Sequence, residues 1–174
     1  MLVSATLKAP NTQKWRGNIT RFEADLEYDA VKRAHRQISK IFFEHEKELF
    51  STQGRSGKHG KWPDLSDAYA AWKRKHFGNL PIMVLRGHLV RSLTKVTSKT
   101  IKTASKSGSK WFFKYGTTLE YGLYHQKGIA GPHGSKTRRT IDPNDTMARE
   151  MIREIQREIV KAAKKTGGFD TAII

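Results

Sequence analysis

Histidines are the first side chains to weigh in this chain, since paired at the right spacing they bind metals or move protons. His45 lies among three glutamates, but the His-Glu-x-x-His pattern of zinc hydrolases requires a second histidine at position 49, which is Leu49. His59, His88 and His133 each stand alone in polar sequence. No histidine pair has the spacing of a metal site, so the sequence predicts no bound metal.

Acidic side chains are scarce in the middle of the chain, where residues 53–141 contain only Asp64, Asp67 and Glu120. A two-metal nuclease needs several converging acidic ligands, and a glycosidase needs a facing pair of carboxylates. Asp64 and Asp67 flank an expected helix start, where capping is the common role. The acids of the two long predicted helices alternate with bases, which predicts solvated faces. The sequence therefore predicts a protein that is not an enzyme and needs no cofactor.

Residues 54–61 are rich in glycine and in basic side chains, a composition that invites comparison with phosphate-binding loops. The P-loop pattern fails on spacing, because the second required glycine falls on His59 and no Gly-Lys-Ser/Thr follows. We expect a flexible basic loop instead. The chain has no cysteine, which excludes disulfides, cysteine-based zinc sites and thiol nucleophiles.

The 174-residue chain carries a formal net charge of +17, and residues 53–141 hold +15 of it. So basic a surface predicts a polyanionic or acidic partner. Five lysines lie on one stretch without an acid: Lys95, Lys99, Lys102, Lys106 and Lys110. Two interpretations of this series stay open. The lysines contact DNA phosphates or an acidic neighbour, or they only keep a hairpin soluble.

Two long helices are expected at the ends of the chain. Residues 1–19 show no sustained period and are expected to form an extended arm. A helix of about 30 residues, roughly 45 Å long, should start at Thr20, where Thr20 and Glu23 form a capping box. The C-terminal helix should start with Asp142 as its N-cap and Pro143 at its first position. A short tail is expected at 167–174.

The middle of the chain predicts shorter elements. A helix should begin at Ser66 or Asp67 and end at Gly78, and a helical turn should include Leu85 and Leu89. The other expected elements are a strand near 94–101, a hairpin tip at 103–110, a strand at 111–117, a helical turn at 121–126 and a loop at 128–139. Together they predict an α+β fold. Its N-terminal and C-terminal helices pack on a small antiparallel β-sheet, in a single domain over residues 20–166 with flexible basic loops.

The start of the chain lacks the basic and then apolar pattern of a signal peptide. Nowhere do 18 apolar residues run together, as a membrane-spanning helix requires. The sequence therefore predicts a soluble protein that is made inside the cell and has no membrane partner.

Three motif clusters, in this order along the chain, carry a resemblance to a known family. They are residues 61–66 followed by Trp72 and Lys73, residues 85–93, and residues 115–117 followed by 121–128. Together they resemble the bacteriophage virion morphogenesis and tail-completion proteins, which are found at the head–tail neck of tailed phages. The sequence departs from that pattern at Arg86 (usually Thr), at Gly122 (usually Ala) and at Lys127 (usually aromatic), and the family's last motif survives only as residues 139–141.

The resemblance implies a structural role without catalysis for the motif residues. They are Trp62, Leu65, Ser66, Leu85, Gly87, Leu89, Ser92, Gly116, Tyr121, His125, Gln126 and Gly128. It implies that His125 is an architectural hydrogen-bonding residue, and that identical subunits form a ring, six-fold or twelve-fold.

The partners implied by the resemblance are other neck and tail proteins and the packaged DNA end. The location implied is the virion, with the host cytoplasm during assembly. A different class of function also stays open, that of a sequence-independent DNA-binding protein acting as a monomer or dimer.

Overall fold

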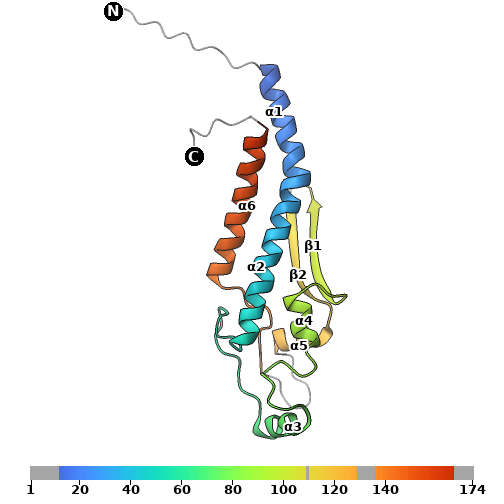
Figure 1. Cartoon of the computed structure of the whole chain (residues 1–174), viewed down its shortest axis with the longest axis vertical. Coiled ribbons are helices and arrows are strands. Elements are labelled where there is room, and N and C mark those ends of the chain that lie inside the picture. The colour runs from blue at the N-terminus through green and yellow to red at the C-terminus, as the bar shows by residue number, and fades with distance from the viewer. Residues whose placement is uncertain (1–11, 109, 129–135, 167–174) are drawn as a thin grey trace, which may run out of the picture. The chain divides into compact units, whose positions relative to one another are not determined.

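The computed structural model describes residues 12–108, 110–128 and 136–166 (Figure 1). In chain order the elements are α1 (Thr12–Asp25), the π-helical turn η1 (Leu26–Ala30), α2 (Val31–Ser51), α3 (Asp67–Phe77), α4 (His88–Thr94), β1 (Thr100–Ser107), β2 (Lys110–Thr117), α5 (Glu120–Lys127) and α6 (Asp145–Lys165). The predicted α+β class is confirmed, with β1 and β2 forming an antiparallel pair.

The chain divides into two compact units, Met1–Ala34 with Arg153–Ile174, and His35–Ile152. We call them the terminal unit and the central unit. The single domain over residues 20–166 stays a prediction. Residues 1–11 of the expected arm and the expected tail at 167–174 lie outside the described residues.

The N-terminal helix begins at Thr12, so the expected extended arm is wrong for residues 12–19 and the capping box at Thr20 is wrong as well. This segment follows Pro10 and contains a single glycine, Gly17, which costs about 1 kcal/mol relative to alanine but does not end a helix. Helical structure then continues through the π-helical turn η1 into α2.

Ion pairs join the two parts of the terminal unit. Arg33 Nε donates to Glu158 Oε2 at 2.6 Å, and Arg33 Nη2 donates to Asp25 Oδ2 at 3.3 Å. Lys165 also pairs with Asp25. Because residue 25 meets residue 165 and residue 33 meets residue 158, the end of α6 runs antiparallel to α1 and the start of α2 (Figure 1). Small side chains are buried on both parts, namely Ala30, Ala34 and Ala162.

Glu158 corrects the expectation that the acids of the long helices are solvated, because it is only 3% exposed. Burial raises the pKa of its carboxyl, but hydrogen bonds from Lys161 and Arg33 outweigh burial and bring the pKa below its usual value. A buried carboxylate with two cationic partners is stabilised in its charged form.

In the central unit, α2 packs on the sheet through aromatic rings. The rings of Phe42 and Tyr115 stack with their centroids 5.1 Å apart, and His35 stacks on Phe113 at 5.7 Å. The Tyr115 hydroxyl donates to the backbone carbonyl of His35 at 3.2 Å. The buried core cluster consists of Phe42, Leu49, Phe50, Trp62, Ile82, Leu89, Leu93 and Met147.

The hairpin lies later in the chain than the sequence predicts. Strand β1 is Thr100–Ser107 rather than 94–101, and the turn begins at Gly108, which has φ +57°. The expected hairpin tip at 103–110 is therefore wrong, since most of it is strand. Three consecutive residues of β1, Ala104–Lys106, pair with Phe113, Phe112 and Trp111 of β2, and Lys102 pairs with Tyr115. This pairing lets a lysine-rich segment form a strand.

Helix α6 begins at Asp145, so the expected cap at Asp142 and the first helical position at Pro143 are wrong. Asn144 is the cap: its Oδ1 accepts the backbone N–H of Met147 at 2.8 Å. The carboxylate of Asp142 instead accepts the backbone N–H of His59 at 2.8 Å and lies 2.6 Å from His59 Nδ1.

Helix α3 begins after Ser66 and ends at Gly78, as the sequence predicts. No described helix is long and apolar enough to cross a membrane.

Candidate functional site

The motifs converge on one pocket of the central unit, with a volume of about 910 Å³. It lies among α3, residues 83–87, the start of α4, α5 and residues 136–138. Seven of the twelve motif residues line it: Leu65, Ser66, Leu85, Gly87, Leu89, Tyr121 and His125. Segments far apart in the sequence thus meet at a single surface, which is the candidate site.

The backbone beside the pocket adopts left-handed conformations at two positions. Gly87 precedes α4 with φ +72°, so the expected helical turn contains Leu89 but not Leu85, which lies before the helix. Met83 also lines the pocket and has φ +66°, a conformation that costs a side-chain-bearing residue about 1 kcal/mol or more. Such strain is often found at binding sites.

Two cations that line the pocket are buried. Lys73 is 4% exposed and Arg138 is 8% exposed. The Nζ of Lys73 donates to the carbonyl of Pro81 at 2.5 Å, and Arg138 donates to the carbonyls of Pro63 at 2.8 Å and of Asp64 at 3.0 Å. Burial lowers the pKa of both groups.

Helix α5 presents Tyr121 and His125 to the pocket, one helical turn apart. Burial raises the pKa of Tyr121. Burial lowers the pKa of His125, and the positive charge of Arg138 lowers it further. The backbone carbonyl of His125 accepts the N–H of Arg138 at 2.9 Å. Its Nδ1, however, has no hydrogen-bond partner among the described residues, so the expected side-chain hydrogen bond is not seen at this atom.

Gly122 explains one departure from the family pattern. A Cβ at this position would lie 3.1 Å from both Leu89 Cδ1 and Thr117 Cγ2. That distance is short for ordinary packing, so glycine lets α5 lie close to α4 and the end of β2.

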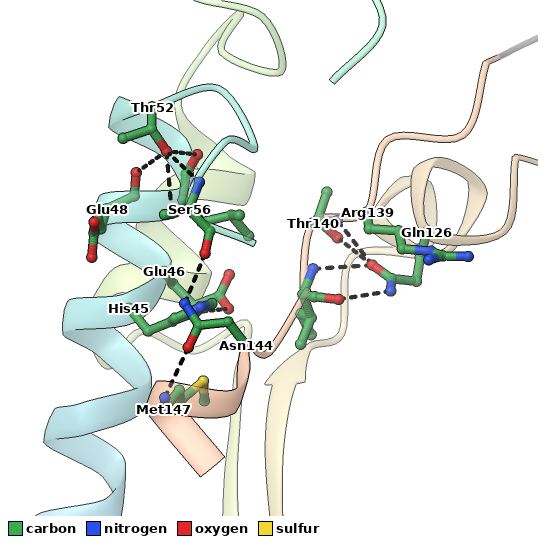
Figure 2. A network of polar contacts seen from close by, with 12 residues as sticks. His45, Glu46, Glu48, Thr52, Ser56, Gln126, Arg139, Thr140, Asn144 and Met147 are labelled. Carbon is green, nitrogen blue, oxygen red and sulfur yellow. Dashed lines mark hydrogen bonds and ion pairs between the residues drawn. The ribbon is translucent and has the colours of Figure 1, made fainter. Parts of the chain in front are cut away.

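Gln126 joins α5 to residues 140–141, as Figure 2 shows. Its Oε1 accepts the backbone N–H groups of Thr140 at 2.9 Å and Ile141 at 3.0 Å, and its Nε2 donates to the Ile141 carbonyl at 2.8 Å. This side chain therefore fixes the backbone that leads from Arg138 towards α6.

Trp62 is part of the core rather than of the surface, with 3% of its area exposed. Its Nε1 donates to the Arg139 carbonyl at 2.8 Å, and its ring meets Phe50 edge-on at 5.2 Å. Gly54 lies so close that a Cβ there would be 2.5 Å from the indole ring. The glycine-rich loop contacts Trp62 through Gly54 and Asp142 through His59, and its flexibility stays a prediction.

The remaining motif residues have backbone roles. Ser92 Oγ donates to the Leu89 carbonyl at 2.8 Å and to Thr117 Oγ1 at 2.9 Å. Gly116 lies inside β2 rather than at its end, since the strand continues to Thr117. Gly128 ends α5 with φ +66°.

The five lysines of the predicted series lie on three segments: Lys95 and Lys99 between α4 and β1, Lys102 and Lys106 on β1, and Lys110 at the start of β2. Lys102 and Lys106 share a sheet face with Tyr115, which contacts α2. Lys110 lies on the opposite face with Phe112, which is 45% exposed. The series therefore does not form one surface.

A buried carboxylate lies apart from the pocket. Glu46 is fully buried, which again corrects the expectation of solvated acids on the long helices. Its Oε1 lies 3.4 Å from His45 Nδ1, and burial raises its pKa to about 7 (Figure 2). In the described part of the chain, no group of three acidic or histidine side chains is arranged to hold a metal ion.

The sequence did not predict that Lys73, Met83, Arg138 and Glu46 line the pocket or are buried, although Lys73 belongs to the first motif cluster. Lys73 stands in a run of basic residues that resembles a solvated face, and Arg138 lies in a loop without a hydrophobic pattern. Their burial depends on segments distant in the chain, so local patterns carry no signal for it.

In comparisons with known proteins, no family model, no curated protein and no solved structure matches this chain.

Proposed function

We propose that the protein is a structural subunit of a tailed-phage virion. It forms a homo-oligomeric ring at the neck or head-proximal end of the tail, completes the tail and helps join it to the head. The location is the virion, with the host cytoplasm during assembly. The partners are copies of itself, other neck and tail proteins and the packaged DNA end.

The observation that carries this proposal is what the motif residues bind. Gln126, Trp62 and Ser92 hydrogen-bond to the protein's own backbone carbonyls and amides, and Gln126 and Ser92 also contact the hydroxyls of Thr140 and Thr117. A catalytic group must keep a polar atom available to its substrate. Side chains committed to the backbone instead hold a surface in one shape, which is what a subunit of an assembly requires.

The arrangement of the lysines favours this role over that of a DNA-binding monomer or dimer. A protein that binds DNA without reading its sequence usually presents its cations as one basic surface. Here the lysines of the series divide between two sheet faces and a connecting segment. Repetition around a ring would bring equivalent lysines of several copies together, without one continuous surface on each copy.

Native mass spectrometry of the purified protein tests the proposal. We expect a closed ring of six or twelve copies whose number of subunits does not change when DNA is added. The matched comparison is binding of duplex DNA at several salt concentrations. A monomer or dimer that binds DNA with a steep salt dependence would overturn the proposal in favour of the DNA-binding alternative.

A further inference from the structure

The pocket contains positive charge without a matching negative charge. Lys73 and Arg138 are each more than nine-tenths buried, and among the described residues their polar partners are backbone carbonyls. Buried charges in proteins are usually paired with an opposite charge. A carbonyl dipole offsets only part of the cost of burying a charge, so these two groups give the pocket a positive potential that favours an anionic partner at its rim.

The rim of the pocket adds more positive charge. Arg86 and Lys136 line it and are exposed. The acidic side chain of the lining is Asp64, whose carboxylate is paired with Lys61 at 3.0 Å and whose charge also acts on Arg138 and Lys136, so it offsets part of the positive charge. The electrostatic potential inside the pocket is therefore positive, and low-dielectric walls strengthen such a field.

The walls between these cations are apolar. Leu65, Val84 and Leu85 are half-buried there beside the buried Leu89. Tyr69 and Tyr121 stand at the pocket with 42% and 40% of their areas exposed. Partly exposed tyrosines around an apolar depression are typical of protein-binding surfaces, where one side chain of the partner is buried.

We infer that this pocket binds an acidic peptide segment of another protein, with an apolar side chain inserted among Leu65, Val84 and Leu85 and with carboxylates facing Arg86 and Lys136. The partner is a different protein, because a second copy of a chain with a net charge of +17 would bring more positive charge to a basic pocket. A nucleic acid offers phosphates for the rim but no aliphatic side chain for the walls.

This inference rests on the pocket alone and goes beyond the proposed function. A ring could form without the peptide site, and a monomer could carry the site.

The probe is a fluorescein-labelled hexapeptide library with Asp or Glu at the four outer positions and Leu, Ile, Phe or Trp at the two central ones. Anisotropy is measured on the full chain. We expect saturable binding. Two control libraries should bind more weakly by about ten-fold or more, one with Ser and Gly at the centre and one with Lys at the outer positions.

Two pairs of matched variants separate the pocket from general charge. Ala68 lines the pocket on α3, whereas Ala71 is exposed on the same helix and does not line it. Ala68→Trp should fill the pocket and abolish binding, and Ala71→Trp should leave it unchanged. The double change Arg86→Gln and Lys136→Gln should weaken binding about five-fold or more. Arg36→Gln with Lys40→Gln, which removes the same charge at exposed positions of α2 outside the pocket, should change it less than two-fold.

The inference is overturned if the acidic apolar library binds no better than its controls, or if Ala68→Trp and Ala71→Trp have equal effects. It is also overturned if single-stranded or duplex DNA displaces the labelled peptides and the Ala68→Trp variant no longer binds that DNA. Circular dichroism of each variant verifies folding, and all of these substitutions are at exposed positions.

Discussion

Glu46 is a carboxylic acid whose pKa is raised by burial. Its side chain is enclosed in the central unit, and its Oε2 has no hydrogen-bond partner among the described residues. Burial favours the protonated acid and outweighs the opposing effect of the neighbouring His45, so the pKa rises from 4.5 to about 7. At neutral pH the protein is therefore close to the point at which this proton leaves.

This shift predicts how stability depends on pH. The unfolded chain releases the proton near pH 4.5 and the folded protein near pH 7, so the free energy of unfolding falls as pH rises through that window. Glu46→Gln stays neutral and should be more stable than the wild type at pH 8 by up to about 3 kcal/mol, with little difference at pH 4. Urea unfolding at both pH values measures this.

The control for this prediction is Glu48→Gln, an exposed position on the same helix, which should show no such pH-dependent gain. A Glu46→Gln protein that is no more stable than the wild type at pH 8 would mean that the carboxylate is solvated or paired in solution.

Gln126 is a second residue whose side chain should contribute measurably to the free energy of unfolding. Replacing it with alanine removes acceptors for the backbone N–H groups of Thr140 and Ile141 and the donor to the Ile141 carbonyl. Unsatisfied buried polar groups are costly, so Gln126→Ala should lower the free energy of unfolding by about 2–3 kcal/mol. Gln156→Ala, at an exposed position on α6, should change it by less than about 0.5 kcal/mol. Thermal unfolding followed by circular dichroism compares the two variants. Equal losses of stability would contradict the role of Gln126 in fixing the backbone of residues 140–141.

At the scale of elements, the sequence predicts structure well where a local signal is strong and poorly where partners decide. Helix α3 has a capping residue, Ser66, and a terminating glycine, and both ends are correct. Strand β1 is displaced in the prediction, because its lysines resemble a loop until the aromatic residues of β2 pair with them. The sequence does not predict the pocket, although seven of the motif residues that it identifies line it. Spacing along the chain does not reveal which distant segments meet in the fold.

The start of α6 shows the same limit, because Asp142 and Asn144 both suit a cap and only tertiary contacts decide between them. Asn144 caps the helix through Met147 and also donates to the Ser56 carbonyl at 2.7 Å (Figure 2). We predict that Asn144→Ala lowers the free energy of unfolding by about 1–2 kcal/mol. Asn144→Asp should recover part of the loss, since it keeps the acceptor. Urea unfolding measures both changes.

Ser66→Ala provides the comparison, because Ser66 precedes α3 but its side chain makes no capping hydrogen bond. Its cost should be within about 0.5 kcal/mol. If Ser66→Ala lowered the free energy of unfolding more than Asn144→Ala, the hydrogen bonds of the Asn144 side chain would not explain its contribution to stability.

At the scale of the whole molecule, the two units carry their charge in different ways. The terminal unit balances its charges through ion pairs between α6 and the α1–α2 segment. The central unit holds most of the net charge of +17 and presents it on separate surfaces: the pocket, the two sheet faces and the connection before β1. Polyanions and acidic proteins therefore have different places to bind.

The two sheet faces give the last prediction, which concerns the packaged DNA end. Lys110 and Lys114 lie on the sheet face that points away from α2. The side chains of Thr103, Ser105 and Phe112 on that face are exposed as well. Lys102 and Lys106 lie on the face that packs on α2. Phosphates reach the open face more easily, so Lys110→Gln with Lys114→Gln should reduce duplex DNA binding more than Lys102→Gln with Lys106→Gln.

Each lysine–phosphate contact adds about 0.9 to the slope of the logarithm of the binding constant against the logarithm of salt concentration. The open-face pair should therefore flatten that slope by about 1.8, and the α2-facing pair by less than half as much. Filter binding of one duplex at several salt concentrations measures all three proteins. An equal change in both pairs would mean that general charge attracts the DNA. No change in either would assign the sheet lysines to solvent, and would leave DNA contact to Lys95 and Lys99 or to other basic segments.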